Sequence, residues 1–223
     1  EREREQRSSA LEQLFSRRAE ALNAAAEGID ARRKRLEARV AMQRGNEAPA
    51  RGSLAGRDSS LKKSTAAIKK LRNITEEGRA GLLTDLEKLN LELYVEEAAR
   101  AVAESRVMKN PGNSGKPRKA VVEVCSTLHQ TYAGFIPALV EALTRILEAP
   151  PGPEASYECK RGAVCLLTEL FLCRAHNDTE AILGMVKTLA KTFMGGGAVT
   201  KEPALEAGAL LVAFARMRGS PAR

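Results

Sequence analysis

Cys125 and His129 are four positions apart, so both side chains would lie on one face of a helix. A thiol and an imidazole placed in this way could ligate zinc, or act as a nucleophile with its base. Zinc needs four ligands, or three and a water, and the other histidine, His176, has no cysteine in a suitable pattern beside it. Cys125 also falls on an apolar stripe, where a cysteine behaves as a small hydrophobe. We therefore expect a core residue, with no metal and no catalytic nucleophile.

The sequence GNSGKP at 112–117 has the outline of a phosphate-binding loop. A Walker A motif needs a glycine five residues before the Gly-Lys pair and a Ser or Thr after the lysine. Asn110 and Pro117 occupy these two positions, and a helical pattern precedes the loop instead of a strand. NIT and NDT, at 73–75 and 177–179, match the glycosylation motif by chance, since no secretion signal precedes them. We expect no enzyme activity, no cofactor and no small-molecule substrate.

Two lysine pairs in RDSSLKKSTAAIKKLRNI, residues 57–74, form the third candidate feature. Leu61, Ile68 and Leu71 form an apolar stripe on a helix, and helical geometry places the lysines on the opposite face. These lysines are either the solvated back of a core-facing helix or a basic strip that contacts RNA phosphates. A second basic segment at 116–119 would extend the strip if it lies nearby. The candidate RNA- or partner-binding residues are Lys62, Lys63, Lys69, Lys70, Arg72, Lys116, Arg118 and Lys119.

Composition limits the class of protein. The 223 residues are 43% hydrophobic and 29% charged, which is ordinary for a globular domain. The net charge of +8 favours polyanionic partners, nucleic acid or anionic lipid, but the 4% of aromatic residues argue against stacking platforms for bases. Four cysteines without a CxxC pair, and no signal segment, indicate a reduced, intracellular chain. No apolar run approaches the length of a membrane span. Because the sequence begins at Glu1 without methionine, we expect a piece of a longer protein.

Residues 1–44 are predicted to form a charged helical extension, and the Gly- and Pro-containing residues 45–57 a linker. The extension is either a solvated, partly frayed helix or a coiled-coil arm, which would require more apolar d positions. Gly28 weakens its middle by about 1 kcal/mol relative to alanine. The basic run at 32–35 is better explained as a solvated helix face than as a localisation signal. The apolar residues of the extension are Leu11, Phe15, Leu22, Ile29, Leu36 and Val40.

Residues 58–223 read as one helix after another, without strand alternation, and we predict an all-α, HEAT-like α-solenoid of antiparallel helix pairs. Asp58 or Ser59 would cap the first helix. Residues 160–173 are apolar nearly all round and would form a central helix. Loops are expected at 109–119, 149–153 and 194–197. The predicted inward residues include Leu61, Ile68, Leu71, Leu82, Leu86, Tyr94, Val102, Val121, Cys125, Leu128, Leu139, Leu143, Ile182, Leu189, Leu205 and Leu210.

Two stretches carry a resemblance to a known family: the run from RDSSLKK to EEAARAVAES, and AVVEVCSTLHQTYAGFIPALVEAL. The most specific elements are DSSLKK, KKL followed by ITEE, LNL with the following Tyr94, and LHQTYAGF. The chain resembles the first MIF4G domain of the up-frameshift protein two (regulator of nonsense transcripts) family. These proteins are scaffolds of nonsense-mediated mRNA decay. The clear match covers Asp58 to Leu143, and the loop at 109–119 is longer and more basic than the family's.

The resemblance implies a helical-repeat MIF4G domain at 58–223, truncated at its C-terminus, that does no catalysis. It implies a scaffold in the surveillance complex on mRNAs with premature stop codons, and the lysine pairs add the expectation of weak RNA contact. Its partners would be other up-frameshift surveillance factors, held mainly by surfaces outside this chain, with no membrane. It also implies a cytoplasmic, perinuclear location. The alternative is a MIF4G module that binds and stimulates a DEAD-box RNA helicase in translation or RNA processing.

Overall fold

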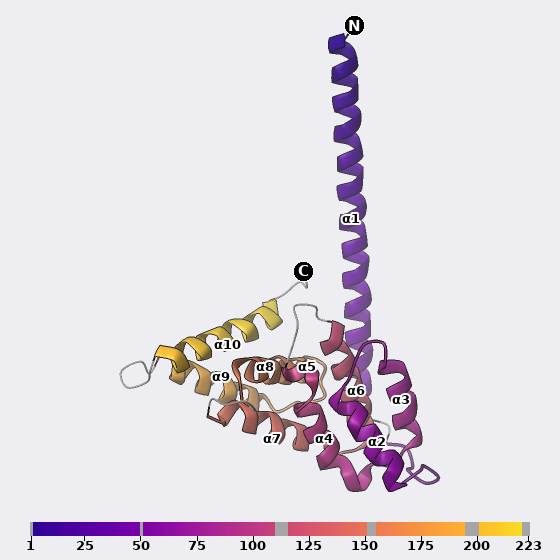
Figure 1. Ribbon diagram of the computed structural model, residues 1–223, viewed down its shortest axis with the longest axis vertical. Coiled ribbons are helices and arrows are strands. Elements are labelled where there is room, and N and C mark those ends of the chain that lie inside the picture. Colours follow the sequence, from indigo (N-terminus) through magenta and orange to yellow (C-terminus); the bar gives the residue numbers. More distant parts are fainter. Residues whose placement is uncertain (1, 50, 110–115, 151–154, 195–200, 220–223) are drawn as a thin grey trace. The chain divides into compact units, whose positions relative to one another are not determined.

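The computed structural model describes residues 2–49, 51–109, 116–150, 155–194 and 201–219. These residues form α-helices and one short 3-10 helix, and none of them lies in a strand longer than an isolated bridge between Asp58 and Leu89. The predicted all-α class is confirmed (Figure 1). In chain order the elements are α1 (Arg2–Glu47), α2 (Leu61–Arg72), α3 (Arg79–Lys88), η1 (Glu92–Tyr94), α4 (Val95–Ala103), α5 (Arg106–Lys109), α6 (Lys116–Thr131), α7 (Phe135–Glu148), α8 (Tyr157–Leu172), α9 (Thr179–Met194) and α10 (Lys201–Gly219).

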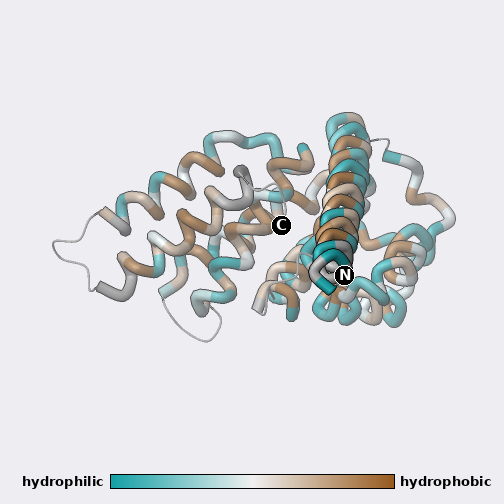
Figure 2. The backbone as a smooth tube through the Cα atoms, turned by 90° about the horizontal axis from the view of Figure 1, so that it is seen from above, coloured by the Kyte–Doolittle hydropathy of each residue, from teal (hydrophilic) through white to brown (hydrophobic). Residues whose placement is uncertain are grey.

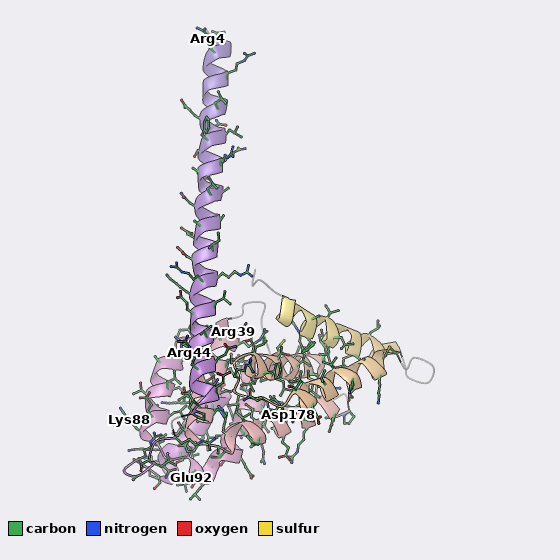
Figure 3. All side chains as sticks on the ribbon, turned by 180° about the vertical axis from the view of Figure 1, so that it is seen from behind. Arg4, Arg39, Arg44, Lys88, Glu92 and Asp178 are labelled. Carbon is green, nitrogen blue, oxygen red and sulfur yellow. The ribbon has the colours of Figure 1, made fainter. Side chains whose placement is uncertain are left out.

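The chain divides into two compact units, and the first is formed by α1 up to Ala41. This part of α1 is a single helix that continues through Gly28 without a break. Its side chains project from all sides of the helix between Arg4 and Arg39 (Figure 3). The helix extends three residues beyond position 44, to Glu47, so it enters the segment expected to be a linker.

The second unit, from Met42 onward, contains helices α2 to α10. Helix α4 packs on α7, α7 on α8, and α10 on both α8 and α9. Hydrophobic and hydrophilic residues alternate along these helices, as expected of helices with one buried face (Figure 2). The largest fully buried side chains include Leu71, Leu91, Leu128, Phe135, Leu139, Leu143, Leu166, Leu170 and Leu210.

Helix α8 is the central helix that the sequence predicted. Its buried residues point in every direction around the axis, from Cys159 to Leu170. Gly162 permits a close approach here, because a Cβ atom at this position would stand 2.7 Å from the backbone oxygen of Met108 in α5. The side chain of Lys160 is also largely buried, and its ammonium lies 3.8 Å from the Glu206 carboxylate of α10.

Two residues predicted to face the core are exposed. Leu61, the first residue of α2, is 65% exposed, and Leu205, near the start of α10, is 70% exposed. Leu61 lies on the apolar side of α2 but in its first turn, which is left uncovered. Leu205 points about 140–160° away from the buried residues Ala207 and Leu210 of α10, so it lies on the outer face of that helix. Periodicity identifies the inner face of a helix, whereas the neighbouring elements decide which of its turns are covered.

The expected loop at 109–119 is shorter than predicted. Lys109 ends α5 and Lys116 begins α6, so both ends of that stretch are helical. Residues 110–115 lie outside the described residues, as do most of the expected breaks at 149–153 and 194–197.

The last turn of α1 is anchored within the second unit through Asn46, whose side chain is 2% exposed. Its Nδ2 donates to Ser126 Oγ at 3.1 Å and to the Cys173 carbonyl at 2.8 Å, and its Oδ1 accepts from Gln130 Nε2 at 3.0 Å. Gly45 leaves room for that glutamine, since a Cβ atom there would stand 2.7 Å from Gln130 Nε2. The segment 42–47 is therefore part of the folded second unit.

Candidate nucleic-acid interface

The candidate basic strip lies on α2, and the residues before this helix fix its start. Ser60 occupies the cap position, one or two residues later than predicted, and its own side chain makes no capping hydrogen bond. Asp58 acts instead: its Oδ1 accepts from the Ser60 backbone N–H at 2.8 Å, and its other oxygen binds the Lys63 ammonium. These hydrogen bonds, that of Lys63 first, hold the pKa of the Asp58 carboxyl well below its usual range.

The structure separates the four lysines into two pairs. The buried residues of α2 are centred on one face, and Lys62 and Lys69 point about 150–170° away from it. Lys63 and Lys70 point about 90–110° away and therefore lie at the sides of the helix. Their ammonium groups bind carboxylates, Lys63 that of Asp58 and Lys70 that of Asp85 in α3, where Nζ and Oδ2 are 2.6 Å apart.

Lys62 and Lys69 are exposed, and neither makes an ion pair with any residue that the structure describes. Arg72 has an acidic partner, as Lys63 and Lys70 have, since its guanidinium lies 3.8 Å from the Glu104 carboxylate. The strip therefore presents two uncompensated charges to solvent, Lys62 and Lys69, seven residues apart on one face. The other basic residues of α2 are partly neutralised by the domain itself.

A shallow groove of about 400 Å³ lies beside the end of α2. Lys69 and Lys70 stand on one wall, and Ile74 and Leu82 supply apolar surface. The remaining lining residues are small or polar: Asn73, Thr75, Gly78 and Gly81. The Lys69 ammonium beside this apolar surface can accept a phosphate and the sugar or base attached to it, while Lys70 is held by Asp85.

Two basic residues of α6, Arg118 and Lys119, do not continue this strip. Lys119 lies 3.7 Å from Glu123, and the same carboxylate binds Arg79 of α3. Arg118 is half-buried beside α8, where its charge opposes the rise that burial causes in the pKa of the Cys165 thiol. The side chain of Lys116, at the start of α6, lies outside the described residues. The structure thus brings together the α2 residues and leaves Arg118 and Lys119 in other surroundings.

A larger groove of about 900 Å³, which sequence reasoning did not find, lies where the N-termini of α4 and α7 meet. Leu93 on its edge is 90% exposed. The groove carries both charges in equal number, so it does not resemble a phosphate site. No sequence signal indicates it, because its lining comes from three separate segments. Its charged lining residues are Arg51, Arg100, Arg145, Glu92, Glu96 and Glu141.

The Cys125–His129 pair lies inside the domain. Cys125 is fully buried, and burial raises the pKa of its thiol well above the ordinary value. The Nε2 atom of His129 lies 3.3 Å from the Asn46 carbonyl oxygen. Within the described ranges, no three His, Cys, Asp or Glu side chains are grouped closely enough to hold a metal ion. None of the helices in these ranges is long and apolar enough to span a membrane.

The fold defined above is that of a MIF4G domain. It superposes on the crystal structure of the first MIF4G domain of the human nonsense mediated decay factor UPF2 with a TM-score of 0.69. The match covers 86% of this chain and 62% of that one at 24% identity, so it establishes the architecture alone. It also confirms the predicted α-solenoid.

Sequence comparison finds similarity to regulators of nonsense transcripts. The chain is 34% identical over 137 residues to Regulator of nonsense transcripts UPF2 of Arabidopsis thaliana, and 38% identical over 88 residues to human Regulator of nonsense transcripts 2. These matches span 57% and 40% of this chain, but 11% and 6% of the two relatives. No family model matches the chain. The resemblance expected from DSSLKK and LHQTYAGF is confirmed.

Proposed function

We propose that this chain serves as a non-catalytic scaffold domain in nonsense-mediated mRNA decay and supports assembly of the surveillance complex. The observation that carries the proposal is the 34% identity over 137 residues to a regulator of nonsense transcripts. The MIF4G architecture agrees with it, because a solenoid of stacked helices presents long surfaces for partners. Other up-frameshift surveillance factors are the proposed partners, with their main contacts outside this chain, and the cytoplasmic, perinuclear location stays a prediction.

The proposed domain organisation follows the three segments expected from the sequence. Residues 1–44 would be a charged helical extension, 45–57 a linker whose first three residues belong to α1, and 58–223 the MIF4G-like domain. The buried side chain of Asn46 adds that the end of the extension is anchored to this domain. Residues 42–47 would therefore already be folded as part of the domain when a partner binds.

Weak RNA contact is proposed for the outer face of α2. Lys62 and Lys69 would contact phosphates, while Lys63, Lys70 and Arg72 mainly hold carboxylates of the domain itself. With two phosphates neutralised on a single strand, log K should fall with log salt at a slope of about −1.4, against about −2.8 for four. Arg118 and Lys119 would contribute little, because they do not continue the strip.

A binding titration with single-stranded RNA at several salt concentrations tests this contact. The Lys62→Ala/Lys69→Ala variant should lose most of the affinity and the salt dependence. The matched Lys63→Ala/Lys70→Ala variant should retain most of both. Unchanged binding in the first variant, or a flat salt dependence of the unmodified chain, would remove RNA from the proposal.

Capture from cell extract tests the scaffold role itself. The immobilised chain should retain surveillance factors of the decay pathway, and nuclease treatment should leave them bound. Addition of the chain to a DEAD-box helicase provides the opposite test. Strong stimulation of its RNA-dependent ATPase, together with no retained surveillance factor, would favour the alternative helicase-stimulating module.

A further inference from the structure

The first unit exposes a regular row of large apolar side chains along α1. Phe15, Leu22, Ile29 and Leu36 recur every seven residues and are 66%, 64%, 69% and 53% exposed. Single exposed hydrophobic residues are common on protein surfaces and need no explanation. A row at heptad spacing is different, because it forms one continuous seam on a helix and is typical of a coiled-coil strand.

A coiled-coil strand has a second inward position in each heptad, beside the row. If the row occupies the d positions, the a positions fall on Glu12, Ala19, Ala26, Arg33 and Val40. Three of these five are small or apolar, so the seam is wider than the row alone suggests between Ala19 and Val40. Gly28 falls at a c position, on the side away from the seam. The helix-weakening residue therefore leaves the contact surface unchanged.

We propose that α1 pairs with α1 of a second copy of this chain as a parallel, two-stranded coiled coil. Arg33 stands at an a position in the middle of the seam, where a polar residue helps to fix register and strand number at some cost in stability. Its guanidinium lies 3.7 Å from the carboxylates of both Asp30 and Glu37 on its own helix. The charge therefore has partners at the edge of the seam.

Charges beside the seam decide the orientation. In a parallel pair, each g residue faces the following e residue of the other helix. Arg32 at g would then meet Glu37 of the second copy, and symmetry repeats this contact. The apolar row could also be matched in an antiparallel pair, with Leu22 against Ile29. That pairing brings g residues together and places Arg18 against Arg32 twice, so like charges oppose it.

Sedimentation equilibrium of the whole chain over a concentration series tests the association. The mass should rise from 24.1 kDa towards twice that value. Ile29→Asp should lower the association constant by roughly 100-fold or more, because one apolar layer is lost from both helices. The matched Ala31→Asp variant, at an outward f position, should associate as the unmodified chain does. A monomer at every concentration, or equal effects of the two variants, would overturn the proposal.

Disulfide trapping tests the orientation, since the four native cysteines are buried. Leu22→Cys alone and Ile29→Cys alone should each form a cross-linked dimer on mild oxidation, while Ala24→Cys at an f position should not. Cross-linking only in a mixture of the first two variants would show an antiparallel pair and refute the assignment. Glu37→Arg should weaken association, and adding Arg32→Glu should restore it. No recovery in the double variant would contradict the proposed ion pair.

Discussion

Replacing Asn46 by alanine should destabilise the domain far more than its place in an expected linker suggests. The side chain makes three hydrogen bonds, to Ser126, Gln130 and the carbonyl of Cys173, at 2.8–3.1 Å. Each such bond contributes a net 0.5–1.5 kcal/mol or so to stability, and the former partners would be left buried without a replacement. We expect a loss of about 2–4 kcal/mol in the free energy of unfolding, which combines these contributions.

The assay is equilibrium unfolding in denaturant, followed by helical circular dichroism, with thermal melting as a second reading. For a chain of this size the melting temperature should fall by about 2–4 °C for each kcal/mol lost. Asn23→Ala, on an exposed position of α1, is the matched control and should stay within about 0.5 kcal/mol of the unmodified chain. If Asn46→Ala matched that control, residues 42–47 would not be anchored as described.

Three further predictions concern the second unit. Leu71→Ala should cost about 2–5 kcal/mol of unfolding free energy because Leu71 is fully buried, whereas Lys69→Ala should change it by no more than about 0.5 kcal/mol. Similar melting temperatures of the two variants would mean that α2 turns a different face to the core. Gly162→Ala should cost about 1–3 kcal/mol in denaturant unfolding, since the new methyl group would strike the backbone of α5, and a neutral effect would refute that close approach. Burial lowers the pKa of both His129 and His176, so the unfolded chain binds more protons than the folded one near and below the ordinary histidine pKa. The unfolding free energy should therefore fall as the pH drops below about 6.5. A His129→Gln/His176→Gln variant with the same pH profile would contradict this.

Local periodicity was enough to predict the fold class and most of the core. The stripe through Ile68 and Leu71, and the apolar run that became α8, follow from helical spacing, which depends on neighbours three and four residues away. Leu61 shows the limit of this argument: it lies on the correct face but in a turn that nothing covers. Coverage depends on elements that sequence spacing does not place.

The anchoring of Asn46 and the pairing of the lysines could not be predicted for the same reason. Asn46 binds residues 80 to 127 positions away, and Lys70 binds Asp85 on the next helix. Helical spacing predicted a basic strip of four lysines, but the carboxylates of Asp58 and Asp85 neutralise two of them. The resemblance, by contrast, rested on short contiguous motifs such as LHQTYAGF, which a single sequence displays completely.

A reporter assay for nonsense-mediated decay tests the central proposal most directly. In cells whose own regulator of nonsense transcripts lacks its first MIF4G domain, this chain would be inserted in place of that domain. The scaffold role predicts that an mRNA with a premature stop codon regains its short half-life, while a matched mRNA without that codon is unchanged. Persistence of the premature-stop mRNA, with the chimaeric protein present and folded, would contradict the proposal.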